Sequence, residues 1–148
     1  MIKNKIEIRE IQYKTDEYRS EVALRDEVLR KPLGMSLYDE NLEAEEYDFH
    51  VGAFLNNSLV GVMILTRLNN DDVKMRQVAV DEQFRGQRVG TQMVYYAENY
   101  AKSMGYRNLL LNARNTAVAF YEKLGYEKFG ESFLEVNIPH YKMRKVFK

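Results

Sequence analysis

Residues 73–104, VKMRQVAVDEQFRGQRVGTQMVYYAENYAKSM, decide which fold this chain is expected to adopt. The short apolar run at 78–80 predicts a strand that is buried on both faces. A glycine-bearing turn at 85–91 follows, and apolar residues then recur at helical spacing until Gly105 ends the pattern. The free amides and the dipole of a helix N-terminus favour an anion at such a turn. The turn therefore predicts a site for the pyrophosphate of a nucleotide-like cofactor, although ordinary tight-turn chemistry also produces this pattern.

Length and composition place the chain among ordinary globular proteins. Its 148 residues fit one core, so residues 1–148 are expected to form a single domain. The 22 basic residues equal the 22 acidic ones, which argues against nucleic acid or an anionic membrane as a partner. The absence of cysteine excludes disulfides, thiolate metal sites and a cysteine nucleophile. No apolar run approaches the roughly 20 residues that span a bilayer, and the cytoplasm is the expected compartment.

The order of the predicted elements indicates an α+β fold. Strands are expected at 6–11, 50–55, 59–68, 73–80, 108–111, 128–136 and 141–147, and helices at 18–29, 93–104 and 116–123. Three consecutive strands joined by short turns imply an antiparallel meander, and the helix after the glycine turn leads to a parallel neighbour of the central strand. We therefore expect a mixed, mainly antiparallel central sheet of six to seven strands flanked by three to four helices. The turn between the last two strands is expected at 137–140.

The segment 39–48, DENLEAEEYD, carries six acids and no basic residue. A charge run of this kind predicts a solvated loop or a short helix. It also fits an acidic rim that attracts a cationic amine substrate, and the two interpretations are compatible. Tyr38, Glu45, Glu46 and Tyr47 are the residues of this region that suit an amine-bearing acceptor.

A second block, AVAFYEKLGY at 117–126, lies downstream of the glycine turn. The two blocks at this spacing resemble those of the GCN5-related N-acetyltransferase (GNAT) superfamily, and the resemblance extends over nearly the whole chain. The first block is similar to that family's acetyl-coenzyme A motif, an Arg or Gln followed by x-x-Gly-x-Gly or Ala. The second is similar to its A-x-x-F-Y-x-K-x-G-F signature. The tail FLEVNIPHYKMRK, residues 133–145, further resembles the ElaA-like bacterial subgroup. The resemblance implies the three-layer α/β arrangement of that family.

The resemblance also implies a co-substrate, acetyl-coenzyme A (acetyl-CoA), with no metal ion. The backbone of residues 78–80 is expected to pair with the pantetheine arm, and an N–H of Val78 or Ala79 to polarise the thioester carbonyl. The arm fits beside the central strand if that strand separates from its parallel neighbour near Leu110. The turn at 85–91 is expected to bind the pyrophosphate. The implied cofactor-binding residues are Val78, Ala79, Val80, Arg85, Gly86, Gln87, Arg88, Val89, Gly90, Thr91, Asn115 and Tyr121.

Two positions depart from the family pattern. Arg88 stands where the motif prefers glycine, so its side chain must point out of the turn or form a charge-assisted bond with a phosphate oxygen. Asn115 sits one residue away from the usual position of an asparagine, which weakens the implication that it contacts the cofactor.

In the family's reaction the amine attacks the thioester directly in a ternary complex. Tyr121 is the candidate general acid because a phenol with a pKa of about 10 is protonated at neutral pH and can donate to the departing thiolate. An aromatic residue on a short amphipathic helix also fits a core position. The general base stays unassigned, with His50, His140, Glu82, Glu135 and a water chain as candidates.

The expected activity is therefore that of an acetyl-CoA-dependent N-acetyltransferase, acting on a primary amine of a small molecule or peptide. The alternative is a non-catalytic CoA-binding or regulatory module on the same fold, which is favoured if Tyr121 faces the core. A Walker-type Gly-Lys-Ser/Thr ending is absent after Gly90, which argues against a P-loop nucleotide binder. The sequence does not identify the acceptor, and it leaves a homodimer open.

Overall fold

The computed structural model describes residues 5–86 and 88–147. Its strands and α-helices are, in chain order, β1 (Ile6–Ile11), α1 (Asp16–Leu29), β2 (Phe49–Leu55), β3 (Ser58–Arg67), β4 (Asp72–Val80), α2 (Val89–Ser103), β5 (Asn108–Arg114), α3 (Val118–Lys123), β6 (Glu127–Lys128), β7 (Phe133–Glu135) and β8 (Ile138–Val146). Short 3-10 helices lie between them: η1 (Lys31–Leu33), η2 (Leu37–Asp39), η3 (Leu42–Glu45), η4 (Glu82–Phe84) and η5 (Asn115–Ala117).

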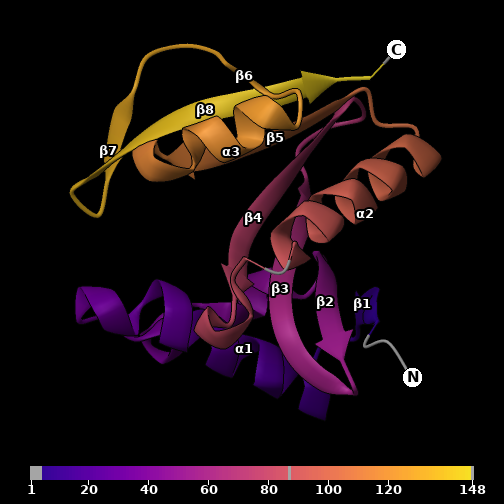
Figure 1. The fold of residues 1–148 in the computed structure, drawn as a ribbon, viewed down its shortest axis with the longest axis vertical. Helices are drawn as coiled ribbons and strands as arrows, with labels where there is room; N and C mark the ends of the chain where they lie inside the picture. Colours follow the sequence, from indigo (N-terminus) through magenta and orange to yellow (C-terminus); the bar gives the residue numbers. More distant parts are fainter. Residues whose placement is uncertain (1–4, 87, 148) are drawn as a thin grey trace. The chain divides into compact units, whose positions relative to one another are not determined.

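The strands hydrogen-bond in the order β1-β2-β3-β4-β5-β8-β6, and β7 pairs with β8 (Figure 1). The pair β4–β5 is parallel, whereas β1–β2, β2–β3, β5–β8, β6–β8 and β7–β8 are antiparallel. The expected fold class, a mixed and mainly antiparallel sheet flanked by helices, is confirmed. Within residues 5–86 and 88–147 the sheet has eight strands, because two short strands, β6 and β7, replace the single strand expected at 128–136.

The chain divides into two compact units. Unit 1 comprises the described residues up to Thr66 and those from Gln77 to Ala97. Unit 2 comprises Arg67–Arg76 and the described residues from Glu98 onward. Strand β4 and helix α2 therefore each contribute residues to both units, and the candidate site residues are distributed between them.

Unit 1 holds the first half of α2 against β3, and Gly61 on β3 makes this possible. A Cβ added at Gly61 would lie 2.8 Å from Met93 Sδ and 3.1 Å from a methyl carbon of Val89. Met93 and Val89 are themselves buried. A side chain at this position would require Met93 and Val89 to shift, so the missing Cβ lets the first half of α2 pack closely against β3.

Unit 1 also contains a buried cluster of charged side chains. Arg25 donates through Nη1 to Glu21 at 2.9 Å and through Nη2 to Glu45 at 2.5 Å. The Tyr18 hydroxyl donates to Glu45 at 2.9 Å. His50 lies with Nδ1 2.9 Å from Glu21 Oε2 and Nε2 2.9 Å from the Glu45 carbonyl oxygen. These bonds join α1, η3 and β2, so the cluster fixes the acidic segment onto the core.

The partners of His50 determine its protonation state. Both ring nitrogens face oxygen acceptors, so both must donate, which only the imidazolium form can do. Burial opposes that charge, but the hydrogen bond from His50 to Glu21 and the Glu21 charge outweigh it and raise the pKa of His50 above its ordinary value. Two carboxylates then balance one guanidinium and one imidazolium, and the buried cluster is neutral overall.

In unit 2, α3 packs against β5 (Figure 1). The Tyr126 hydroxyl donates to Glu98 Oε2 of α2 at 2.8 Å, and Lys145 Nζ donates to Glu98 Oε1 at 3.1 Å. The turn expected at 137–140 is wrong: Val136 and Asn137 form the turn, with φ of 48° and 62°, and β8 begins at Ile138. Proline tolerates an edge or first position of a strand, so Pro139 did not have to mark the turn.

The His50 interaction predicts a pH-dependent stability. The folded-state pKa of His50 is above the unfolded value of about 6.5, so its contribution is complete below that pH and is lost as pH rises through the folded pKa. Urea unfolding at pH 6, 7.5 and 9 is expected to show a falling unfolding free energy, and His50→Gln is expected to remove most of this slope. Nitrogen-15 spectra that find a neutral His50 ring at pH 7 would contradict the interpretation.

Candidate active site

The end of β4 has an irregular backbone immediately before the residues expected to hold the thioester arm. Gln77 adopts φ 55°, a left-handed conformation that is uncommon in a strand and typical of a β-bulge. Its side-chain Oε1 is buried and has no hydrogen-bond partner among the described residues. Ala79 is buried, whereas Val78 and Val80 are half-buried. The strand therefore changes direction where backbone groups are expected to face a ligand.

The parallel ladder between β4 and β5 is short. It is registered from the pair Asp72–Asn108 to the pair Lys74–Leu110, although β4 continues to Val80. The ladder therefore ends at Leu110, where the family resemblance requires the two strands to separate.

The connection from β4 to α2 belongs to unit 1. Asp81 begins it by accepting a hydrogen bond from the amide of Gln83 at 3.0 Å, which starts η4. Gly86 adopts φ 81° and Arg88 adopts φ 65°. Gln87 lies outside the described residues. Arg88 thus has the left-handed backbone that glycine adopts most readily, and its side chain is exposed, which is the outward orientation expected for a departure from glycine.

The start of α2 presents backbone donors that have no acceptor within the helix. The amide of Gln92 donates to the Arg88 carbonyl oxygen at 3.1 Å, which makes Arg88 the N-cap residue. The amides of residues 89–91 have no acceptor within the helix, and an arginine side chain cannot cap them because it has no acceptor atom. The first turn also carries no acidic residue. The helix dipole there is therefore left for an external anion.

Tyr121 and Asn115 belong to unit 2. Tyr121 is 8% exposed, and burial raises the pKa of its hydroxyl to about 12. Its ring packs edge-on against Phe120 at 5.0 Å and Tyr126 at 5.9 Å between centroids, and Phe120 is the more exposed of the adjacent pair. Asn115 is exposed at the start of η5.

The hydroxyl of Tyr121 differs from those of the other buried tyrosines. Tyr18 donates to Glu45 and Tyr126 donates to Glu98, so both hydroxyls are used inside the protein. No described residue forms a hydrogen bond with the Tyr121 hydroxyl. The ring of Tyr121 is buried, but its hydroxyl is not committed to a described residue as those of Tyr18 and Tyr126 are, which leaves it for a ligand.

The structure excludes one of the candidate general bases and leaves the others unassigned. His50 is enclosed in the buried charge cluster and both of its nitrogens are engaged, so it cannot take a proton from a substrate. His140 is 4% exposed, with Nδ1 2.8 Å from the Ile138 carbonyl oxygen and Nε2 3.3 Å from Glu135. Glu82 is exposed in η4. None of these contacts identifies a base.

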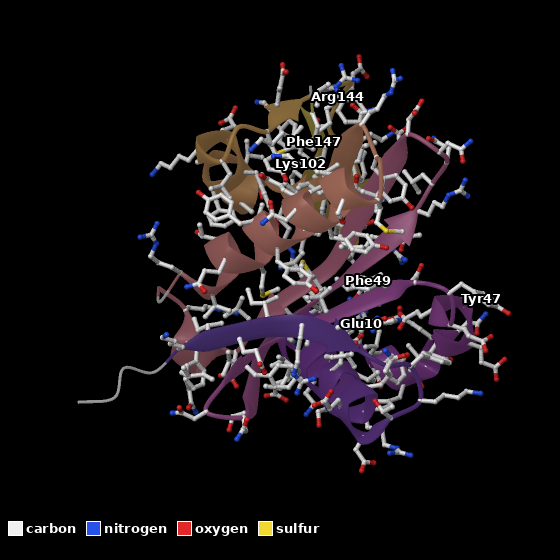
Figure 2. The ribbon with its side chains drawn as sticks, turned by 90° about the vertical axis from the view of Figure 1, so that its right-hand side faces the viewer. Glu10, Tyr47, Phe49, Lys102, Arg144 and Phe147 are labelled. Carbon is white, nitrogen blue, oxygen red and sulfur yellow. The ribbon has the colours of Figure 1, made fainter. Side chains whose placement is uncertain are left out.

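Only some side chains of the acidic segment 39–48 are exposed and unpaired, as an acidic rim would require. Glu45 is 7% exposed and bonded to Arg25, and Glu40 is paired with Arg30 at 2.6 Å. Tyr47, in contrast, is 94% exposed and projects from the surface (Figure 2). The expectation that Glu45 faces a substrate is therefore wrong, because a guanidinium twenty residues earlier in the chain makes its burial favourable.

Glu21, Glu45 and His50 also place ligand-type atoms within 4.8 Å of one another, as a metal site does. The guanidinium of Arg25 already bonds both carboxylates, so this donor set does not fit a metal ion.

Among the described residues, no helix is both long enough and apolar enough to cross a membrane.

Comparison with known proteins extends these observations. A family model described as "Acetyltransferase (GNAT) domain" matches residues 14–147. The Bacillus subtilis (strain 168) protein YjcF, named as an uncharacterized N-acetyltransferase, is 30% identical over 123 residues, covering 82% of this chain and 87% of YjcF. Escherichia coli ElaA shares the fold with a TM-score of 0.79 at 21% identity, covering 95% of this chain and 99% of ElaA.

A GNAT family acetyltransferase from Elizabethkingia anophelis, solved with acetyl-CoA bound, has a TM-score of 0.73 at 20% identity and covers 98% of this chain and 100% of its own. The family match over residues 14–147, together with the observed sheet topology, shows that this chain belongs to the GNAT acetyltransferase family and is an acyltransferase.

Proposed function

We propose that this chain transfers an acetyl group from acetyl-CoA to a primary amine of a small molecule or peptide by direct attack in a ternary complex. One observation carries the proposal: the amides of residues 89–91 begin α2 without an intrahelical acceptor or a neighbouring acid. A pyrophosphate is an anion that such a helix start accommodates, and CoA supplies one. In this proposal residues 1–148 work as a single acetyltransferase domain.

The residues before the turn fit the pantetheine arm. The left-handed backbone at Gln77 interrupts the regular strand, and the buried Gln77 Oε1 lacks a donor. An amide N–H of the pantetheine arm is a donor of the kind that this oxygen needs. In the proposal the backbone of residues 78–80 bonds the arm, and the amide of Val78 or Ala79 polarises the thioester carbonyl.

Tyr121 is the proposed general acid. Its pKa of about 12 keeps the hydroxyl protonated throughout the pH range in which an enzyme is assayed. Its proton is not committed to any described residue, unlike those of Tyr18 and Tyr126. The amine nitrogen forms the new bond to the carbonyl carbon, and the Tyr121 proton passes to the thiolate as the C–S bond breaks. The nitrogen then releases one proton to solvent, and Tyr121 regains one from solvent, which restores the acid.

The rest of the cofactor set follows from the phosphate turn. Gly86 and the exposed Arg88 have the left-handed backbone that carries the chain into α2, and Arg85 and Thr91 flank the proposed phosphate position. Gln87 and Asn115 keep the cofactor roles that the family resemblance implies for them. The proposed acceptor class is a primary amine.

A thermal-shift screen with acetyl-CoA, CoA and ATP tests the function. Ligand at about 100 times its dissociation constant is expected to add about 2.7 kcal/mol to the unfolding free energy. Both CoA species are expected to raise the melting temperature by several degrees, and ATP at the same concentration much less. If neither acetyl-CoA nor CoA raises the melting temperature, the proposed function is wrong.

Tyr121→Phe tests the acid. The change removes a hydroxyl that has no hydrogen-bond partner among the described residues, so the stability is expected to be unchanged and the affinity for CoA to stay within about twofold of wild type. Turnover, followed as thiol released from acetyl-CoA with a panel of primary amines, is expected to fall by roughly 10²- to 10⁴-fold.

Tyr126→Phe is the matched control for Tyr121→Phe, because it removes a buried hydroxyl that is bonded to Glu98. This variant is expected to lose about 1–3 kcal/mol of stability and to keep its turnover. Equal turnover in Tyr121→Phe and wild type would rule out the acid role.

A further inference from the structure

One face of the sheet in unit 2 gathers basic side chains. Lys74 on β4 pairs in register with Leu110 on β5, which pairs with Arg144 on β8. Asn112 pairs with Lys142 one step further along. Cross-strand partners share a face, so the two lysines, the arginine and the asparagine lie on the same side of the three strands.

The helices of unit 2 pack on the opposite side. Lys145 Nζ reaches Glu98 of α2 at 3.1 Å and the Leu124 carbonyl oxygen, just beyond α3, at 2.9 Å. Met143, on the same side as Lys145, is fully buried. The side chains of Lys142 and Arg144 alternate with these and are exposed. The basic face is therefore not the one that α2 and α3 cover.

The positive charge on this face is only partly compensated, because the strand register also places Asp72, Glu127 and Glu135 there. The ammonium groups of Lys74 and Lys142 make no hydrogen bond or ion pair with any described residue. Burial, Arg76 and Lys142 together lower the pKa of Lys74, and Glu135 is the acid that opposes them. Glu135 itself lies 3.3 Å from His140 Nε2, so its charge is shared. Among the described residues, basic side chains on this face outnumber acidic ones, although the whole chain is neutral: Lys74, Arg76, Arg114, Lys142 and Arg144 against Asp72, Glu127 and Glu135.

The half-buried Asn112 adds a neutral donor between the two lysines. No described residue forms a hydrogen bond with its side chain, and its register places it beside Lys142. Lys74 and Lys142 are two strand spacings and two residues of strand rise apart, about 12 Å, so their long side chains can both reach one small group placed over β5. Two ammonium groups and an amide donor suit a carboxylate or phosphate.

We propose that this face of unit 2, formed by Lys74, Asn112 and Lys142, binds the oxyanion group of the acceptor, which is then an amine that also carries a carboxylate or a phosphate. The assignment to the acceptor rests on the proposed acetyltransferase function; the oxyanion site does not. Lys74 stands on β4, the strand whose last residues are proposed to bond the thioester arm.

The test uses the full chain without cofactor and two matched pairs of probes. Ethanolamine phosphate is compared with ethanolamine, and β-alanine with propylamine, in amide chemical-shift titrations. At least one oxyanion probe is expected to give saturable shifts centred on Lys74, Asn112 and Lys142, weakening as salt is added. A response to one pair alone decides between phosphate and carboxylate. No saturable shift with either oxyanion probe, or equal shifts with ethanolamine or propylamine, would overturn the proposal.

Variants that each remove one positive charge give a second test of the oxyanion site. Lys142→Gln is expected to weaken binding of the oxyanion probe by tenfold or more. Lys102→Gln is the matched control because Lys102 lies on α2, 5.3 Å from the centroid of the Phe147 ring (Figure 2), and it is expected to bind the probe within twofold of wild type. Equal affinity in Lys142→Gln and Lys102→Gln would also overturn the site.

The two proposals fail separately. If the oxyanion probes bind but acetyl-CoA does not, the site stands and its assignment to an acetyl acceptor falls. If acetyl-CoA binds but the oxyanion probes do not, the acetyltransferase proposal stands and the site falls. With turnover in hand, Lys142→Gln is expected to raise KM for an oxyanion-bearing amine by tenfold or more and to change kcat less than twofold.

Discussion

Three backbone amides at the start of α2 lack an acceptor within the helix, and the candidate site is built around them. Their position is set by close packing, since Gly61 lets Met93 and Val89 approach β3 to distances that a Cβ would forbid. Two features leave these amides available to a ligand. The N-cap residue is Arg88, whose side chain has no acceptor atom, and the first turn of α2 contains no acidic residue. Packing and the missing cap together leave the N-terminal charge of the helix for a ligand.

Much of this arrangement could be predicted from sequence. Periodicity located α1, the β2–β3 hairpin and α2, because each pattern reports a face that must be buried. The paired asparagines at 56 and 57 predicted the hairpin turn, since asparagine tolerates left-handed backbone. The glycine turn and the AVAFYEKLGY block led to the right family. These signals are local, and local chemistry is what a single sequence records best.

Other features could not be predicted because they depend on partners distant in sequence. Glu45 sits in a run of acids that looks solvated, and only Arg25 on another element makes its burial favourable. The left-handed backbone of Gln77 has no marker, because glutamine in a strand usually indicates nothing more than an exposed position. The turn at Val136 was missed because a β-branched residue rarely adopts positive φ, and Pro139 was the stronger apparent signal.

The buried charge cluster and the phosphate turn have different physical roles within unit 1. Glu21, Arg25, Glu45 and His50 satisfy one another, so the cluster holds η3 in place and offers nothing to a substrate. The start of α2 does the opposite, because the amides of residues 89–91 have no acceptor within the helix. Unpaired polar groups, more than perturbed pKa values, therefore distinguish the proposed functional residues from the structural ones in this chain.

Calorimetric titration of CoA into wild type and Gly90→Val tests the central claim most directly. Gly90 lies in the first turn of α2, and a valine side chain there is expected to block the approach of a phosphate to the backbone. A loss of CoA affinity of tenfold or more, with an unfolding free energy within about 1 kcal/mol of wild type, is the predicted result. If folded Gly90→Val binds CoA as tightly as wild type, the start of α2 does not hold the phosphates.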